Sequence, residues 1–503
     1  MTTSNLLYRC SAIRDALVDA GLFTATTGTS AAAETDIAVN SWRIGTAPFL
    51  LSAEQAAFFH RLGPHLLSFY RTLNRLYAES VRGLQPSWVA EALDRGKPEG
   101  LVTYSRMKRF RDLLPAVIRP DVIPTSDGMV ITELDSVPGG IGLTAALSRA
   151  YADLQPQPSA PSTQHPALST QHSPLVGGRD GMISGFAAML THVRGSREGC
   201  TAVVVSDEAK DYRPEMTWMA AQLSERGFDT RCVEPRDVRF TEGGLRLLDG
   251  DREKPIALIY RFFELFDLPN IPKSELMQYA AKKNWVAVTP PYKPALEEKS
   301  AFALFHHPVL RPFWRRELGE DTWLHLTAIM PRTWLLDPAP VPPSATIPGL
   351  SIGDRAIADW RDLASATQKE RHYVIKPSGF SELAWGSRGV SIGHDLPQSE
   401  WAGAIDGALA AFPRTPHVLQ EFHKGRQYHM EYFDAASGDI RQMAGRARLS
   451  PYYFVTGEKV ELAGILATVC PADKKVIHGM KDAILVPCTA AGGDTAPVLS
   501  AEV

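Results

Sequence analysis

The chain has 503 residues, of which 44% are hydrophobic and 22% charged, so it is a globular protein too long for a single core, with two to four structural units expected. Its net charge of −3 excludes the basic field of a nucleic-acid-binding protein and a polybasic membrane signal. Five scattered cysteines, no leader-like N-terminus and no apolar run of about 18 residues predict a cytoplasmic protein with no membrane partner, disulfide framework or zinc site.

Residues 1–110 are predicted to be mainly helical. Ser52 and Gln55 form a capping-box pattern, and apolar residues at helical spacing follow it. A second helix is expected over 64–81 and a third over 88–93. Nothing in this region indicates what it does.

The segment 111–154 carries three carboxylates on a predicted hairpin. Glu133 and Asp135 are two residues apart, so on a strand both side chains leave the same face. A turn at 125–128 would bring Asp121 back beside them. Three hard oxygen ligands on one surface suit Mg²⁺, above all when phosphate oxygens complete its octahedron. A solvated hairpin with acidic residues facing outward is the alternative.

A helix is expected over 141–153, and residues 155–178 then have the composition of a linker. Their Pro, Ser and Gln content cannot bury enough apolar surface, so a flexible insertion is expected. Residues 179–290 alternate between helical and strand patterns and predict a small parallel α/β domain. Arg261 and Glu264 follow one of its strands and would contact a substrate or form a salt bridge at the rim.

Residues 291–490 contain a lysine followed by a glycine-rich loop. An apolar run ends in Lys376, the loop carries Gly379, Gly386 and Gly389, and a second apolar run follows. Glycines let backbone amides approach phosphate oxygens, and the lysine supplies a fixed charge. No helical pattern follows at the spacing that a P-loop or a dinucleotide fingerprint requires, and glycine-rich hairpins are common.

A further apolar strand ends in Gln420, Glu421 and Phe422. Its edge would offer backbone N–H and C=O groups and a carboxylate to an adenine ring. Further on, Arg446 and Arg448 alternate to one face of a predicted strand, where two planar guanidinium groups suit a γ-phosphate or a carboxylate. Exposed charge on an edge strand is the alternative.

The lysine strand, the glycine loop and the strand ending in Gln-Glu together resemble the ATP-grasp superfamily, in which a β-layer closes over the triphosphate and the Gln-Glu strand reads adenine. That family usually places its acidic metal ligands after this strand, whereas here they lie far upstream. This order resembles the circularly permuted branch typified by glutathionylspermidine synthase, where an Arg-x-Asp segment precedes a Glu-x-Asn segment and a proline. The corresponding residues are Arg119, Asp121, Glu133, Asp135 and Pro138, with aspartate where asparagine is more frequent.

The resemblance implies an α/β (α+β) chain with a circularly permuted ATP-grasp fold, a preceding parallel α/β domain and a helical N-terminal region, followed by a tail at 491–503. It implies Mg²⁺ on Asp121, Glu133 and Asp135, and charge compensation at the γ-phosphate by Arg119 or Arg448. The implied ATP-binding residues are Lys299, Lys376, Gly386, Gly389, Gln420, Glu421 and Phe422. Lys299 would otherwise pair with an acid on a helix surface.

The activity implied is ATP- and Mg²⁺-dependent carboxylate–amine ligation. A substrate carboxylate would take the γ-phosphoryl group as an acyl phosphate, and an amine would displace phosphate to form an amide. The partners would be small-molecule or peptide carboxylates and amines, which the sequence does not identify, and it gives no oligomeric state. A non-catalytic ATP-binding protein with the same fold is the alternative, motivated by Asp135. An unrelated α/β enzyme or binding module with accidental matches is the third possibility.

Overall fold

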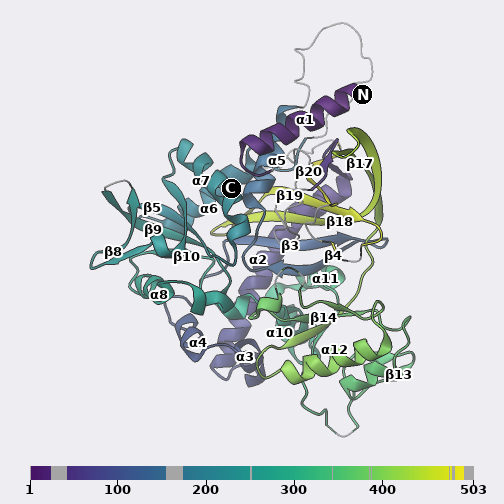
Figure 1. Cartoon of the computed structure of the whole chain (residues 1–503). Coiled ribbons are helices and arrows are strands. Elements are labelled where there is room, and N and C mark those ends of the chain that lie inside the picture. Colours follow the sequence, from purple (N-terminus) through teal and green to yellow (C-terminus); the bar gives the residue numbers. More distant parts are fainter. Residues whose placement is uncertain are drawn as a thin grey trace, which may run out of the picture.

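The computed structural model describes residues 2–23, 42–154, 174–249, 252–342, 344–384, 386, 388–474, 476–477 and 482–491. The linker expected at 155–178 lies outside them except for its last five residues, as does the tail except for residue 491. The described residues form one large sheet, two smaller sheets and a two-stranded ribbon, with helices packed between and around them (Figure 1).

The large sheet contains β1 (Ile44–Gly45), β2 (Phe49–Leu51), β3 (Val117–Pro124), β4 (Met129–Asp135), β17 (Gln427–Asp434), β18 (Asp439–Thr456), β19 (Lys459–Pro471) and β20 (Ile484–Ala490). Its order is β1-β17-β18-β19-β20-β2, and β3 pairs with both β18 and β4. Strand β18 is long enough to pair with β17 along its first half and with β3 along its second half. This arrangement joins the hairpin near residue 120 to strands more than 300 residues downstream.

Two helices cover opposite faces of this sheet. Tyr453 donates its hydroxyl to the carbonyl of Phe59 on α2 (Ala53–Val81), at 2.7 Å. The next residue, Phe454, packs its ring 5.6 Å from that of Phe186 on α6 (Gly181–Arg194). Because neighbouring strand residues point to opposite faces, the two helices sandwich the sheet. Helices α1 (Thr3–Asp19) and α5 (Ile141–Asp153) complete the layer that contains α6.

The N-terminal region differs from its prediction in two respects. The capping box of Ser52 and Gln55 is present, but α2 continues through Pro64 as one helix where two were expected. Strands β1 and β2 also join the large sheet. They were not predicted, because strands of two and three residues are too short to show an alternating pattern. The expected third helix is α3 (Ser87–Asp94), and α4 (Glu99–Ser105) follows it.

The second sheet has a parallel core, as expected. It consists of β6 (Thr230–Val233), β5 (Cys200–Val205), β9 (Arg252–Phe262) and β10 (Ala287–Thr289). Two strands that the sequence pattern missed, β7 (Arg239–Thr241) and β8 (Gly244–Asp249), add to it in antiparallel fashion, so the sheet is mixed. Helices α7 (Arg213–Glu225) and α8 (Ser274–Lys282) and the 3-10 helix η3 (Leu265–Asn270) follow its strands.

The third sheet has the order β11-β16-β14-β15. Its strands are β11 (Thr333–Leu335), β14 (Tyr373–Pro377), β15 (Ser391–Ile392) and β16 (His417–Glu421), and α12 (Gln398–Ala411) packs against it. Trp401 of α12, Ile375 of β14 and Leu419 of β16 share a separate buried cluster. The η4 turn (Pro294–Leu296) and α9 (Ser300–His306), α10 (Arg311–Leu318) and α11 (Glu320–Ile329) lie between this sheet and α2, and β12 (Ser351–Ile352) pairs with β13 (Arg355–Ala356).

Among the described residues, no helix combines the length and the apolar character needed to cross a membrane.

Candidate functional site

The predicted hairpin is present as β3 and β4. Asp121 lies opposite Glu133, and Arg119 lies opposite Asp135. The turn closes with a hydrogen bond of 2.7 Å from the amide of Thr125 to the carbonyl of residue 128. Strand pairing therefore gathers four charged side chains from two short sequence motifs.

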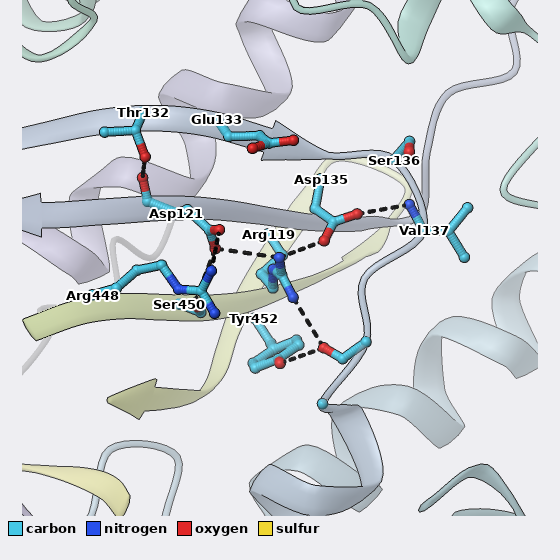
Figure 2. Close-up of polar contacts among 12 residues, drawn as sticks. Arg119, Asp121, Thr132, Glu133, Asp135, Ser136, Val137, Arg448, Ser450 and Tyr452 are labelled. Carbon is cyan, nitrogen blue, oxygen red and sulfur yellow. Dashed lines mark hydrogen bonds and ion pairs between the residues drawn. The ribbon is translucent and has the colours of Figure 1, made fainter. Parts of the chain in front are cut away.

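Arg119 is the centre of this group (Figure 2). Its guanidinium forms ion pairs with Asp135 and with Asp121, the latter at 3.3 Å, and donates to the carbonyl of Gly139 at 3.1 Å. Tyr452 on β18 donates to the same carbonyl at 2.6 Å. Only 11% of the Arg119 side chain is exposed, so these contacts form largely out of water. Arg119 thus bridges two carboxylates on adjacent strands.

Asp121 and Asp135 respond differently to this environment. Asp121 is buried and the Asp135 side chain is 22% exposed, and loss of solvent raises a carboxyl pKa, but Asp121 also contacts Arg448 at 3.1 Å and accepts from Ser450 at 3.0 Å. Its pKa is lowered because Arg119 and Arg448 outweigh burial. The pKa of Asp135 is raised, because burial and the nearby carboxylates of Asp121 and Glu133 outweigh Arg119. The two strands therefore hold one firmly ionised and one less acidic carboxyl group.

Two lysines from distant segments reach the same hairpin. Lys299, at the start of α9, lies 2.8 Å from Glu133. Burial lowers the pKa of Lys299, but the carboxylates of Glu133, Glu264 and Asp135 together raise it more, so the pKa is raised overall. Lys376, on β14, donates to the carbonyl of Thr132 at 3.2 Å and to the amide oxygen of Gln420 at 2.9 Å. With neutral hydrogen-bond partners, burial lowers its pKa to about 8.

The three carboxylates are not gathered into a ready metal cluster. Across the described residues, no group of three or more His, Cys, Asp or Glu side chains stands close enough to hold a metal ion. Both oxygens of Asp121 are engaged, whereas Glu133 is paired through one oxygen to Lys299 and is 33% exposed. Asp135 is likewise engaged through both oxygens, by Arg119 and by the amide of Val137, so Glu133 is the one of the three that keeps an oxygen without a described partner, and the magnesium site stays a prediction.

The glycine loop connects β14 to β15, as expected. Gly379 lies so close to the carbonyl of Glu297 that an added Cβ would stand 2.3 Å from the oxygen. Gly386 has a φ of +62°, which only glycine adopts easily, and the Gly389 amide bonds to the carbonyl of Leu383 at 3.0 Å. Gly379 and Gly386 thus have backbone reasons to be glycine that are independent of any ligand.

The strand ending in Gln420, Glu421 and Phe422 is not an edge strand, which corrects one expectation. Strand β16 lies between β11 and β14. The Glu421 amide donates to the carbonyl of Arg332, and the Phe422 amide donates to that of His372, both at 2.9 Å. These two N–H groups are therefore already bonded, so they cannot serve an adenine ring in this conformation.

Two arginines form contacts other than those predicted from the sequence. Arg446 does not join Arg448 at the hairpin, because its guanidinium donates to the carbonyls of Gly425 and Ala472. Arg261 forms no rim salt bridge with Glu264, because it is fully buried and pairs with Glu297.

Glu264 stands out among the carboxylates around the hairpin. Its two oxygens each accept from the hydroxyl of Ser136, at 3.0 Å, and no described cation lies within ion-pair distance of it. Burial, followed by the carboxylates of Glu297 and Asp135, raises its pKa to about 8. It lines a cavity of about 20 Å³ whose walls include Val137, Ser206, Glu208, Tyr212, Phe262 and Phe266. Such a volume holds one small polar group.

The sequence patterns missed several residues of this region. Ser450 is one residue of a long strand, and its alternation with Arg448 could have placed it beside Asp121. Glu297 and Glu298 precede Lys299 in a short charged run, in which only the lysine is predicted to belong to the site. Nothing in the sequence around Lys97 signalled its contact with Glu298.

Comparisons with known proteins agree with this architecture. No protein-family model and no curated protein matches the sequence. The structure resembles the apo form of a glutathione synthetase-like effector from Globodera pallida, with a TM-score of 0.55 and 11% identity over 98% of both chains. The chain has a glutathione synthetase-like α+β fold. A proposed gamma-glutamylcysteine synthetase from Methylobacillus flagellatus also matches, at 12% identity over 85% of this chain and 88% of that one, but its TM-score of 0.41 carries no argument.

The match spans almost the whole chain. At 11% identity it establishes the fold alone, so the chemistry must be argued from the residues of this chain.

Proposed function

We propose that this protein is an ATP- and Mg²⁺-dependent carboxylate–amine ligase with a circularly permuted ATP-grasp fold. The observation that carries the proposal is the charged cluster on the hairpin, in which the carboxylates of Asp121, Glu133 and Asp135 are all neutralised by cations. Three cations, Arg119, Arg448 and Lys299, form ion pairs with these carboxylates, and a fourth, Lys376, reaches the same hairpin through the carbonyl of Thr132.

A cluster of this composition suits exchange with a metal-bound triphosphate. Phosphate oxygens can replace carboxylates as partners of the lysines and arginines, and a divalent cation can replace these side chains as partner of the carboxylates. Each buried charge would then keep a partner before and after binding, which avoids the cost of an uncompensated charge. A structural ion-pair network needs no excess of either sign, whereas this cluster has one excess positive charge when Lys376 is protonated.

In the proposed site, Glu133 and Asp135 would hold Mg²⁺, with Asp121 fixing the orientation of Arg119 and Arg448. The bound metal would supply charge neutralisation between phosphate oxygens. Lys376 and Lys299 would bind phosphate oxygens, with Gly386 and Gly389 in the loop above them. Gln420, Glu421 and Phe422 would border the base through their side chains, because the amides of the last two are engaged.

The reaction proposed is phosphoryl transfer from ATP to a substrate carboxylate, followed by displacement of phosphate by an amine. Arg119 or Arg448 would balance charge on the transferred group, since each guanidinium presents several donors in a fixed plane. No covalent protein nucleophile is needed. The contribution of the chain is positioning and charge compensation.

We also propose that the amine substrate places its ammonium group in the cavity at Glu264. A partly buried carboxyl group with a pKa of about 8 is mostly protonated at neutral pH, and an ammonium group beside it would favour its ionised form and pair with it. The aromatic walls from Tyr212, Phe262 and Phe266 would attract the same cation. Arg388 of the glycine loop pairs with Glu208 at the cavity, at 3.3 Å, so the loop borders the amine as well as the nucleotide.

The test is Mg²⁺-dependent ADP release by the purified protein with a panel of amino acids, short peptides and amines. We expect release that requires both a carboxylate and an amine and that is lost in Glu133→Gln. The matched control is Glu461→Gln, a half-exposed glutamate on β19 that pairs with Lys459. Release that persists unchanged in Glu133→Gln would contradict the proposed site.

A non-catalytic ATP-binding protein is the second candidate, and one contact favours it. Asp135 stands where the resemblance expects asparagine, and its ion pair with Arg119 holds the arginine that would otherwise face the γ-phosphate. Such a protein would bind ATP with Mg²⁺ but release no ADP with any pair of substrates. Restoring ADP release by Asp135→Asn would identify this contact as the cause.

A further inference from the structure

The connection between α3 and α4 packs against the C-terminal end of α12, the helix of the third sheet. Arg95 lies over the ring of Phe412 at the end of α12, 4.5 Å from its centroid. Gly96 has a φ of +74°, and a Cβ there would stand 1.7 Å from the carbonyl oxygen of Arg414. Only glycine permits this approach. The N-terminal region is thereby anchored to the part of the molecule that carries the glycine loop.

The next residue, Lys97, forms a buried ion pair. Its ammonium nitrogen lies 2.5 Å from a carboxylate oxygen of Glu298, and the two side chains are only 1% and 2% exposed. The same nitrogen lies 5.7 Å from the ring centroid of Phe380, in the glycine loop. Both charges are removed from water, so each depends on the other for compensation.

Glu298 connects the ion pair of Lys97 to the glycine loop. Its second oxygen accepts a hydrogen bond from the hydroxyl of Ser378, which itself accepts from the amide of Ser300 at 3.0 Å. The amide of Lys299 donates to the carbonyl of Ser378 at 3.2 Å. Ser378 is two residues beyond Lys376, so one buried network fixes the backbone beside both lysines.

We propose that Lys97 is a positioning residue that holds the glycine loop, Lys299 and Lys376 in one arrangement. It contacts neither the hairpin carboxylates nor the cavity at Glu264 in any described interaction. Its action is through Glu298 and Ser378. This assigns a role to the N-terminal region, and its consequence for nucleotide binding rests on the proposed function.

The decisive experiment is hydrogen exchange of the full-length protein without nucleotide. In Lys97→Met, the amides of Lys299, Ser300 and Ser378 should exchange at least about tenfold faster, because their hydrogen-bonded network loses its anchor. Amides between β18 and β19 should be unchanged. Lys97→Arg keeps the charge and should stay close to the wild type. Unchanged exchange at the three amides, or equal acceleration in β18 and β19, would overturn the proposal.

A second variant covers the case in which Lys97→Met fails to fold. Ser378→Ala keeps the ion pair of Lys97 with Glu298 but removes the hydroxyl that bonds to Glu298 and accepts from the Ser300 amide. Exchange should therefore accelerate directly at Ser300, and at Lys299 because the Ser378 backbone is no longer held by Glu298. Normal exchange at both amides in this variant would also overturn the proposal.

Titration of Mg²⁺–ATP then separates this inference from the proposed function. If the wild type binds ATP, Lys97→Met should weaken binding about tenfold, and Lys97→Arg should restore it. Undiminished ATP affinity in Lys97→Met would contradict the positioning role. If the wild type binds no ATP, the proposed function fails, and the exchange data alone decide the role of Lys97.

Discussion

The β3–β4 hairpin and the cavity at Glu264 are neighbouring regions in which partly or fully buried carboxyl groups have opposite surroundings. On the hairpin, Asp121, Glu133 and Asp135 all have a cationic partner. At the cavity, Glu264 has only the hydroxyl of Ser136 among its described contacts. The difference separates two kinds of ligand. The paired cluster can exchange partners with a metal-bound anion, whereas Glu264, mostly protonated at neutral pH, would ionise beside an incoming cation.

Of the substitutions on the hairpin, Arg119→Met should lower the free energy of unfolding most. Arg119→Met leaves Asp121 and Asp135 without their shared partner in a buried setting, so the free energy of unfolding should fall by about 3–5 kcal/mol. Chemical denaturation measures this. The control is Arg361→Met, whose ion pair with Asp406 is about 60% exposed on both sides and should contribute no more than about 1 kcal/mol. Equal losses in the two variants would contradict the central position of Arg119.

Substitutions of Lys376 and Lys299 should differ in their effect on stability, although both lysines contact the hairpin. Lys376→Met should weaken Mg²⁺–ATP binding by roughly 10–100-fold, because it removes a point charge from the phosphate site. Its effect on stability should be small, since it removes no ion pair from Glu133. Lys299→Met removes that pair and should weaken both ATP binding and stability. Calorimetric titration and denaturation of both variants measure this difference, and identical effects of the two would contradict it.

Glu264→Gln should change how the free energy of unfolding depends on pH. The pKa of Glu264 is raised to about 8 in the fold, so its stabilising contribution is complete below the unfolded carboxyl pKa of about 4.5 and is lost as pH rises through 8. The slope is at most about 1.4 kcal/mol per pH unit. The variant should show a flatter fall of unfolding free energy between pH 5 and 8, roughly the span of these two values. Superimposable pH profiles would contradict the raised pKa of an unpaired Glu264.

The same variant should also raise the KM for the amine, with little change in the KM for ATP, if Glu264 binds the ammonium group. A matched control is Glu264→Asp, which keeps the charge but shortens the side chain. A larger change in the KM for ATP than in the KM for the amine would place Glu264 in the nucleotide site instead.

Asp135→Asn should have the smallest effect. It releases Arg119 from one of two carboxylates but keeps an oxygen facing the same position. We expect unchanged or moderately raised ADP release, by a few-fold at most, together with retained Mg²⁺ dependence. Asp121→Asn is the contrasting variant, because it disturbs contacts with Arg448 and Ser450 as well. A complete loss of ATP binding in Asp135→Asn would contradict this view of the hairpin.

The sequence predicted those features that depend on local pattern. The capping box at Ser52, the turn at 125–128 and the alternation of Glu133 and Asp135 are all set by neighbouring residues, and the structure contains each of them. The glutathione synthetase-like fold is likewise consistent with the strand order inferred around Lys376.

The remaining features depend on which strands pair and which buried charges meet. Strand β16 lies between two others, so the predicted edge at Glu421 does not exist, and no local pattern distinguishes an inner strand from an edge. Arg261 forms its ion pair with Glu297 and not with Glu264, and Lys97 pairs with Glu298, about 200 positions away along the chain. Such long-range pairing of charges cannot be read from spacing along the chain.

The central claim is that the hairpin exchanges its own ion pairs for a metal-bound triphosphate. Its most direct test is calorimetric titration of the protein with ATP, with and without Mg²⁺, in the wild type and in Glu133→Gln. We predict that Mg²⁺ strengthens ATP binding at least about tenfold in the wild type and much less in the variant. Equal ATP affinity with and without Mg²⁺, or no ATP binding at all, would contradict the account.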